Sequence, residues 1–216
     1  MKLLELRDVK ASFGSKQVLG PIDLDIVRGE RIALVGGSGA GKSTLLSLIY
    51  DQLRSRSALV PQELGLVPTL SVFHNVYMGR LSAHPTWYNL ANLLRPFRKE
   101  LDAITPILEQ LAIAEKLRTP AGELSGGQKQ RTAIARALFQ DAEVLLADEP
   151  VSALDGPLSE VVMEALCANY QTAVIALHDV DLALRFTTRV VGIKEGIIAL
   201  DQPSNRLSPQ DLLPLY

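Results

Sequence analysis

Gly36-Gly37-Ser38-Gly39-Ala40-Gly41-Lys42-Ser43 fits the pattern G-x-x-x-x-G-K-[ST] at each of its fixed positions. The short apolar run at residues 31–35 predicts a buried strand before this segment, and residues 42–53 have the apolar spacing of a helix after it. Glycines between a strand and a helix let backbone N–H groups point inward at a phosphate, beside the positive end of the helix dipole. We therefore predict a phosphate-binding loop here.

Within this loop, Lys42 is expected to meet the β- and γ-phosphates of a nucleotide, and Ser43 to offer its hydroxyl to Mg²⁺. The alternative is a glycine-rich turn that binds nothing, and the complete match to the pattern argues against it. The predicted nucleotide-binding positions of the loop are Gly36, Gly37, Ser38, Gly39, Ala40, Gly41, Lys42, Ser43 and Thr44.

A second candidate site follows the apolar run at residues 144–147, which ends in Asp148 and Glu149. In parallel sheets, ligands bind at the carboxyl ends of the strands, where these acids would lie. Asp148 is placed to support Mg²⁺, and Glu149 could polarise the water that attacks a phosphate. Taken alone, the pattern is that of a strand leaving the core, and the phosphate-binding loop makes the functional interpretation the better one.

The order of the remaining elements predicts an α/β fold with a parallel sheet. Residues 3–13 and 18–27 alternate as two paired antiparallel strands, and further strands are predicted at 58–61, 173–177 and 190–193. Helices are predicted at 127–139 and 158–170. Residues 69–123 break the alternation with three helical patterns, at 71–78, 87–94 and 101–111. We expect residues 1–216 to form a single domain with a helical insertion at about 69–123.

Composition narrows the possible functions. The 22 Lys and Arg nearly balance the 24 Asp and Glu, so nucleic acid is not an expected partner. The single Cys167 and the absence of a secretory leader favour the cytoplasm. No apolar run approaches the roughly 18 residues that span a bilayer, so a role at a membrane would require a partner chain.

Leu124-Ser125-Gly126-Gly127-Gln128 resembles the signature of ABC ATPases. By itself it is also a capped helix start, because Ser125 can cap the helix that follows. Other family elements occur in the family's order. Asp155 resembles the last residue of the D-loop, His178 the switch histidine, Gln62 the Q-loop glutamine and Phe13 the aromatic platform for the base.

The resemblance implies a P-loop NTPase fold and an enzyme that hydrolyses ATP with Mg²⁺. It implies catalytic roles for Lys42, Gln62, Glu149 and His178, and metal-binding roles for Ser43, Gln62 and Asp148. It also implies a head-to-tail dimer of two ATP-binding subunits, with two copies of this chain as the expected form. The signature of one subunit would then close over the nucleotide held by the other, through Ser125, Gly126, Gly127 and Gln128.

Three segments, residues 70–80, 85–94 and 178–185, resemble the ATPases of phosphonate importers. The resemblance implies a transmembrane permease as partner, a solute-binding protein acting indirectly, and a place at the cytoplasmic face of the inner membrane. Residues 85–94 form a Trp-bearing insertion, and the alternative is an amphipathic helix that buries Trp87 and Leu90. Asp179 departs from this branch, which often has Gln there.

A larger departure lies before Gln62. The family usually inserts a long segment that builds antiparallel strands, whereas here little more than Arg54-Ser55-Arg56-Ser57 separates helix from strand. Pro61 also stands where an aromatic residue is common. We therefore expect a mostly parallel central sheet and a reduced N-terminal antiparallel sheet.

Three other functions stay open at this point. The chain could energise import of another small solute. It could be a soluble ABC ATPase of DNA repair or translation, although the tandem cassettes, coiled-coil insertion and basic patches of those proteins are not visible. It could also be a nucleotide-dependent regulatory module that does not hydrolyse ATP, against which Glu149 and His178 both argue.

Overall fold

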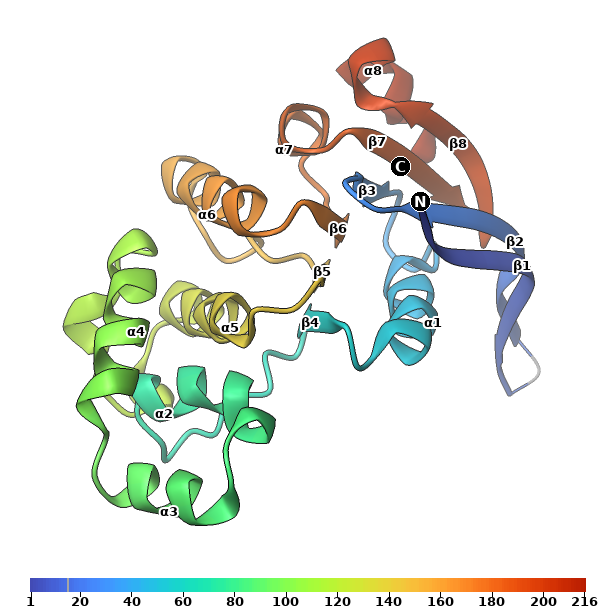
Figure 1. The fold of residues 1–216 in the computed structure, drawn as a ribbon. Coiled ribbons are helices and arrows are strands. Elements are labelled where there is room, and N and C mark those ends of the chain that lie inside the picture. The colour runs from blue at the N-terminus through green and yellow to red at the C-terminus, as the bar shows by residue number, and fades with distance from the viewer. Residues whose placement is uncertain (15) are drawn as a thin grey trace. The chain divides into compact units, whose positions relative to one another are not determined.

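The computed structural model describes residues 1–14 and 16–216, and the chain forms two compact units (Figure 1). The first comprises Met1–Gln62, Glu143–Ser152 and Tyr170–Tyr216, and the second comprises Glu63–Ala142 and Ala153–Asn169. The predicted insertion at 69–123 lies wholly in the second unit. The organisation into a single domain stays a prediction.

The first unit is built on a six-stranded sheet with the strand order β4-β5-β6-β3-β7-β8. All neighbouring strands are parallel except β8, which pairs antiparallel with β7. Strands β3, β5 and β6 are apolar and almost wholly buried, as expected for parallel strands covered on both faces. The mostly parallel sheet is confirmed. The strands are β3 (Arg31–Val35), β4 (Ser57–Val60), β5 (Val144–Asp148), β6 (Thr172–Ala176), β7 (Arg189–Lys194) and β8 (Ile197–Pro203).

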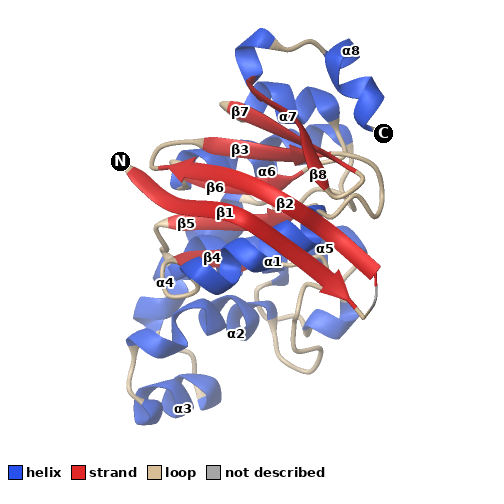
Figure 2. Cartoon of the chain, turned by 90° about the vertical axis from the view of Figure 1, so that its right-hand side faces the viewer, coloured by secondary structure: helices blue, strands red, loops and turns tan. Residues whose placement is uncertain are grey.

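A long hairpin of β1 (Lys2–Phe13) and β2 (Lys16–Val27) forms a separate two-stranded antiparallel sheet. Helix α1 (Lys42–Leu53) packs between this hairpin and the central sheet, as Figure 2 shows. The main core gathers apolar side chains from all three layers, among them Ile26, Ile49 and Leu146. Because α1 ends at Leu53 and β4 begins at Ser57, no further strand intervenes there, and the predicted reduction of the antiparallel sheet is confirmed.

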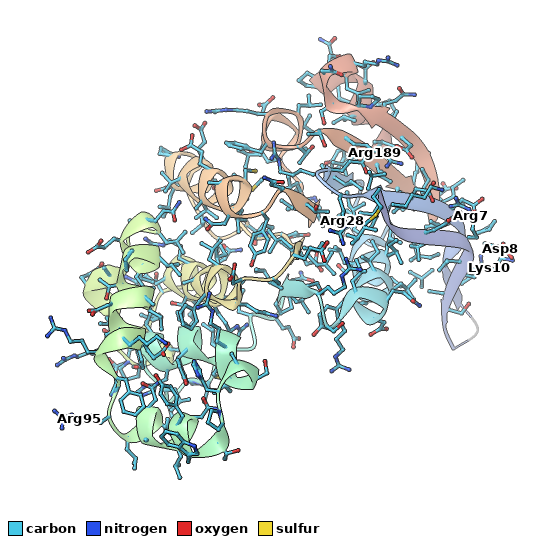
Figure 3. All side chains as sticks on the ribbon, in the orientation of Figure 1. Arg7, Asp8, Lys10, Arg28, Arg95 and Arg189 are labelled. Atoms are coloured by element: carbon cyan, nitrogen blue, oxygen red, sulfur yellow. The ribbon has the colours of Figure 1, made fainter. Side chains whose placement is uncertain are left out.

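Charged side chains cover the outer side of the hairpin, where Arg7, Asp8 and Lys10 project from β1 (Figure 3). Such charges discourage an exposed strand from pairing with another chain. Near the end of β2, Arg189 of β7 joins the hairpin to the central sheet. Its guanidinium makes two contacts of 2.6 Å with Asp201 of β8 and donates to the backbone oxygen of Asp25 at 2.9 Å.

Helices make up the second unit, and they include the three predicted from the helical patterns. Helix α5 packs against α2, α4 and α6, and its buried residues are mostly apolar. Among the described residues, no helix is long and apolar enough to cross a membrane. The helices are α2 (Val72–Tyr77), α3 (Thr86–Leu94), α4 (Arg98–Gln110), α5 (Gly126–Gln140) and α6 (Gly156–Asn169); the first unit adds α7 (Val180–Phe186) and α8 (Pro209–Leu212).

Asn75 organises the turn that leads into α2. Its side chain is fully buried and accepts from the N–H of Val67 at 2.7 Å. The same amide donates to the backbone oxygens of Val67, Leu70 and Ser71 at 3.0–3.1 Å. One buried amide therefore makes hydrogen bonds to four backbone groups of the turn.

We predict that Asn75→Ala lowers the free energy of unfolding by about 1–3 kcal/mol, because the N–H of Val67 loses its partner and the contacts of the buried amide with three carbonyl oxygens are removed. Denaturant unfolding measures the change. Gln110→Ala, which truncates an exposed amide in the same unit, is the matched control and should stay within about 0.5 kcal/mol of the unmodified chain. Equal stabilities of the two variants would contradict this role for Asn75.

Candidate functional site: a phosphate-binding pocket

The loop after β3 has a backbone that only glycine allows at two positions. Gly36 has φ +145°, and a Cβ atom there would lie 2.2 Å from the backbone oxygen of Ile193. Gly41 has φ +108°, and its Cβ would lie 2.4 Å from the side chain of Leu19. Both positions combine a left-handed backbone with a close neighbour, so the glycines of the motif are required by geometry.

Lys42 begins α1 and turns back over the loop. Its side chain is 5% exposed, and Nζ donates to the backbone oxygens of Gly36 at 2.6 Å and Gly37 at 3.1 Å. Burial lowers the pKa of Lys42, whereas the nearby carboxylates of Glu149 and Asp148 raise it. Because the N-cap of α1 is a glycine without a side-chain acceptor, the N–H groups of the first turn can bind an anion.

Four neighbouring parallel strands bring the predicted site residues to one edge of the sheet. Strands β4, β5, β6 and β3 are adjacent in that order, and all end at the same edge. Gln62 follows β4, Glu149 follows β5, His178 follows β6 and Gly36 follows β3. Parallel pairing therefore collects residues that lie more than a hundred positions apart in the sequence.

Gln62, Glu149 and His178 line one pocket of about 190 Å³ in the first unit, together with residues 38–44 of the loop. Of the predicted nucleotide-binding positions in the loop, Gly36 and Gly37 are not among the residues of its wall. Phe13 ends β1, and its side chain lies outside the described part of the chain. Val18 is an additional wall residue that the sequence analysis missed, because an apolar residue in a strand carries no motif. The pocket is lined by Val18, Ser38, Gly39, Ala40, Gly41, Lys42, Ser43, Thr44, Gln62, Glu149 and His178.

Glu149 takes a left-handed backbone conformation, with φ +51°. Its N–H donates to the backbone oxygen of Ala176 at 3.1 Å, and its own backbone oxygen accepts from the N–H and hydroxyl of Ser152. This turn directs the side chain into the pocket, where Oε1 lies 2.7 Å from His178 Nε2. A carboxylate paired with an imidazole beside the phosphate loop can accept a proton from water.

Asp148 is the last residue of β5 and is 8% exposed. Its Oδ1 is buried and has no hydrogen-bond partner among the residues that the structure describes. A buried carboxylate oxygen without a partner is costly, unless a cation or water binds it. Asp148 is also close enough to raise the pKa of Lys42. Its environment therefore fits a ligand of a divalent cation.

The signature segment lies in the second unit and forms a capping box at the start of α5. The hydroxyl of Ser125 accepts from the N–H of Gln128 at 3.3 Å, and Gln128 Oε1 accepts from the N–H of Ser125 at 3.0 Å. A Cβ atom at Gly127 would lie 3.0 Å from the backbone oxygen of Ala153, so the D-loop runs close over the helix. Gly126 is the first residue of α5.

The D-loop is tied to α5 by a residue to which the sequence analysis assigned no role. Gln130 is 4% exposed, and its Oε1 accepts from the N–H of Ala153 at 2.9 Å. Asp155 follows, and its Oδ1 accepts from the N–H of Leu158 at 3.2 Å at the start of α6. The sequence signal that could have indicated this role was a second glutamine two residues after the signature. In the first unit, Asp179 caps α7 by accepting from the N–H of Leu182, which explains an Asp there.

The fold and pocket define the class as a P-loop NTPase. The sequence profile described as ABC transporter matches residues 19–58 and 50–152, and the chain belongs to this family. The two matched segments overlap at residues 50–58, where α1 leads into β4.

Relatives are similar over nearly the whole chain. The phosphonates import ATP-binding proteins PhnC of Caulobacter vibrioides and Pseudomonas entomophila are 38% and 37% identical, over 99% of this chain and 93% and 91% of theirs. Among solved structures, an ATP-binding cassette captured as a dimer after hydrolysis, bound to ADP and Pi, is 25% identical with a TM-score of 0.76, covering 93% of this chain and 98% of that one. The chain is thus an ABC-type ATPase that binds nucleotide.

We predict that Lys42→Ala weakens nucleotide binding by about 10- to 100-fold and abolishes turnover, because a charge-assisted hydrogen bond to phosphate is lost. Calorimetric titration and phosphate release measure the two effects. Lys99→Ala removes an exposed lysine of α4 and serves as the control. Unchanged affinity in the Lys42 variant would show that this loop is not the phosphate site.

Proposed function

We propose that the chain hydrolyses ATP to energise a membrane importer of phosphonate or a related oxyanion. The observation that carries the hydrolytic part is the 2.7 Å pair between Glu149 and His178, which lines the same pocket as the phosphate-binding loop. The names of the relatives, which are phosphonates import ATP-binding proteins, support the choice of substrate.

In the proposed reaction, the loop binds the triphosphate of ATP through its backbone N–H groups, the start of α1 and Lys42. Lys42 exchanges its contacts with the backbone oxygens of Gly36 and Gly37 for phosphate oxygens. Glu149 accepts a proton from the attacking water, and His178 holds the carboxylate in the pocket through the contact at Nε2. Catalysis of phosphoryl transfer is mainly positioning and charge stabilisation, which these residues supply.

Mg²⁺ is the proposed metal cofactor, held by Asp148, Ser43 and Gln62. The unpartnered Oδ1 of Asp148 supports this assignment, and Ser43 and Gln62 both line the pocket. Protein sites for Mg²⁺ usually supply one or two oxygen ligands and leave the rest to phosphate and water. When bound, the ion would neutralise charge that develops on the phosphate oxygens.

The proposed working form is a head-to-tail homodimer. Ser125, Gly126, Gly127 and Gln128 of one subunit would face the nucleotide of the other, and Asp155 would lie at the same junction. Two observations support this form. The N-terminus of α5 has the N–H groups of an anion site, and an ATP-binding cassette of the same fold is a dimer.

Helix α3 is the proposed docking site for the permease, because its polar face is turned inward. Tyr88 donates to Glu100 at 2.8 Å, Tyr77 donates to Asn89 at 2.7 Å, and Asn92 is fully buried. The apolar residues face outward, with Trp87 69% and Leu94 82% exposed. The alternative that this helix buries its apolar residues is therefore wrong for Trp87 and also for Leu90, which is 59% exposed.

An apolar pocket continues this surface, lined among others by Leu70, Met78, Leu90 and Leu93 of the second unit. Exposed apolar surface next to a hollow is typical of a protein-binding site. Burial raises the pKa of Tyr77 to about 12, so its phenol remains the neutral donor that holds α3 in place. Through this surface the chain would sit peripherally at the cytoplasmic face of the inner membrane, and a solute-binding protein would act indirectly through the permease.

We predict that Glu149→Gln lowers the rate of ATP hydrolysis by about 10²–10⁴-fold and leaves ATP binding intact, because only the proton acceptor is removed. Loss of a negative charge beside the phosphates should also trap an ATP-bound dimer, which light scattering would detect. Asp148→Asn is the comparison, and it should lose Mg²⁺-dependent binding as well as rate. Hydrolysis by the Glu149 variant within about twofold of the unmodified chain would refute this mechanism.

We predict that Trp87→Ser reduces transport at least about tenfold in vesicles reconstituted with the permease, while basal ATP hydrolysis is unchanged, since buried Trp residues dominate binding energy at interfaces. Glu115→Ala, a charge removal outside α3 in the same unit, is the control. Normal transport by the Trp87 variant would mean that the permease docks elsewhere.

A further inference from the structure

The segment Leu213–Leu215, followed by Tyr216, lies against the phosphate-binding loop in the first unit. Leu215 is 7% exposed, and it packs so closely on Gly192 of β7 that a Cβ atom there would lie 2.5 Å from it. Lys194 Nζ donates to the backbone oxygen of Pro214 at 2.6 Å. The segment is thus fixed to β7 of the central sheet at two points.

One hydrogen bond joins this segment directly to the loop. The N–H of Gly37 donates to the backbone oxygen of Leu215 at 3.1 Å. The backbone of Gly36 also lies close enough to the Tyr216 phenol to lower its pKa against the larger, raising effect of burial. These are the first two glycines of the motif, and neither belongs to the pocket wall. The contacts therefore brace the loop from outside and leave its phosphate-facing N–H groups free for a ligand.

The hydroxyl of Tyr216 makes a further contact. It donates to the backbone oxygen of His178 at 3.2 Å, and the two rings lie 6.4 Å apart. Burial raises the pKa of the Tyr216 phenol, so the hydroxyl is protonated and remains a donor at neutral pH. The C-terminal segment therefore contacts the start of the phosphate-binding loop through Leu215, and through the Tyr216 hydroxyl it contacts the residue whose imidazole meets Glu149.

We propose that Tyr216 is a positioning residue for ATP hydrolysis, which holds His178 at a fixed place relative to the phosphate-binding loop. The proposal rests on the proposed hydrolytic function. His178 is a half-exposed side chain in a loop between β6 and α7, and its ring is otherwise held through Glu149. A tether on its backbone oxygen fixes where Nε2 meets Glu149, and small displacements at such a pair are costly in rate.

Tyr216 is not placed as a core residue would be, because it is 48% exposed while its hydroxyl faces backbone groups of two loops. Removal of the hydroxyl should therefore affect the geometry of the site more than the stability of the fold. Tyr216→Phe keeps the ring and deletes only the oxygen. Tyr50→Phe, which removes a phenolic hydroxyl from α1 in the same unit, is the matched control.

The test measures kcat, ATP affinity and the imidazole NMR signals of the three histidines in both variants of the full chain. Tyr216→Phe should lower kcat by about 3- to 10-fold, the range of one neutral hydrogen bond, with ATP affinity changed less than about twofold. The signals of His178 should shift, while those of His74 and His84 stay in place. Tyr50→Phe should leave all of these quantities unchanged.

Two results would overturn the inference. The first is a Tyr216→Phe variant with unchanged kcat, and the second is a fall in kcat without any change at His178. Failure of the proposed ATPase function can be distinguished from failure of this inference. In that case the unmodified chain would release no phosphate from ATP in the presence of Mg²⁺.

Discussion

Parallel pairing of β4, β5, β6 and β3 is the constraint on which the rest of the site depends. Each strand is short and apolar, and each ends at the same edge, so the four following loops meet in one place. The parallel register of these strands sets their carboxyl ends side by side, and their burial between layers holds them there. The core that stabilises the sheet therefore also sets the spacing between Glu149, His178 and the phosphate-binding loop.

Unusual backbone conformations at a few residues complete the geometry of the site that the sheet positions. Gly36 and Gly41 let the loop bend where any other residue would collide, and Glu149 turns its carboxylate toward the pocket through a left-handed backbone. Hydrogen bonds to Ala176 and Ser152 hold this turn. The Asp148 carboxylate, one residue earlier, stays with the strand. Two adjacent acids thus acquire different environments, one buried without a partner and one paired with an imidazole.

The sequence predicted the strands and helices around the motifs because period and turn chemistry are local signals, and β3 and α1 were predicted with their exact bounds. It missed β8, whose residues alternate in burial only weakly, and α7. The sequence analysis left open that α3 buries Trp87, which is in fact exposed. A helical spacing of apolar residues identifies an apolar face but does not indicate what covers that face. The role of Tyr216 could not be predicted for a related reason. Tyr216 lies near residues 36 and 178, which are far apart in the sequence, and no local sequence pattern indicates that they are close in the fold.

The left-handed backbone at Glu149 places stability and activity in opposition. A non-glycine residue in this region costs about 1 kcal/mol or more, whereas glycine adopts it readily. Replacement of Glu149 by glycine would therefore relieve strain in the folded chain and remove the carboxylate at the same time. Selection or design for thermostability alone would therefore favour glycine at position 149. Glu149 would be retained only if ATP turnover were required at the same time.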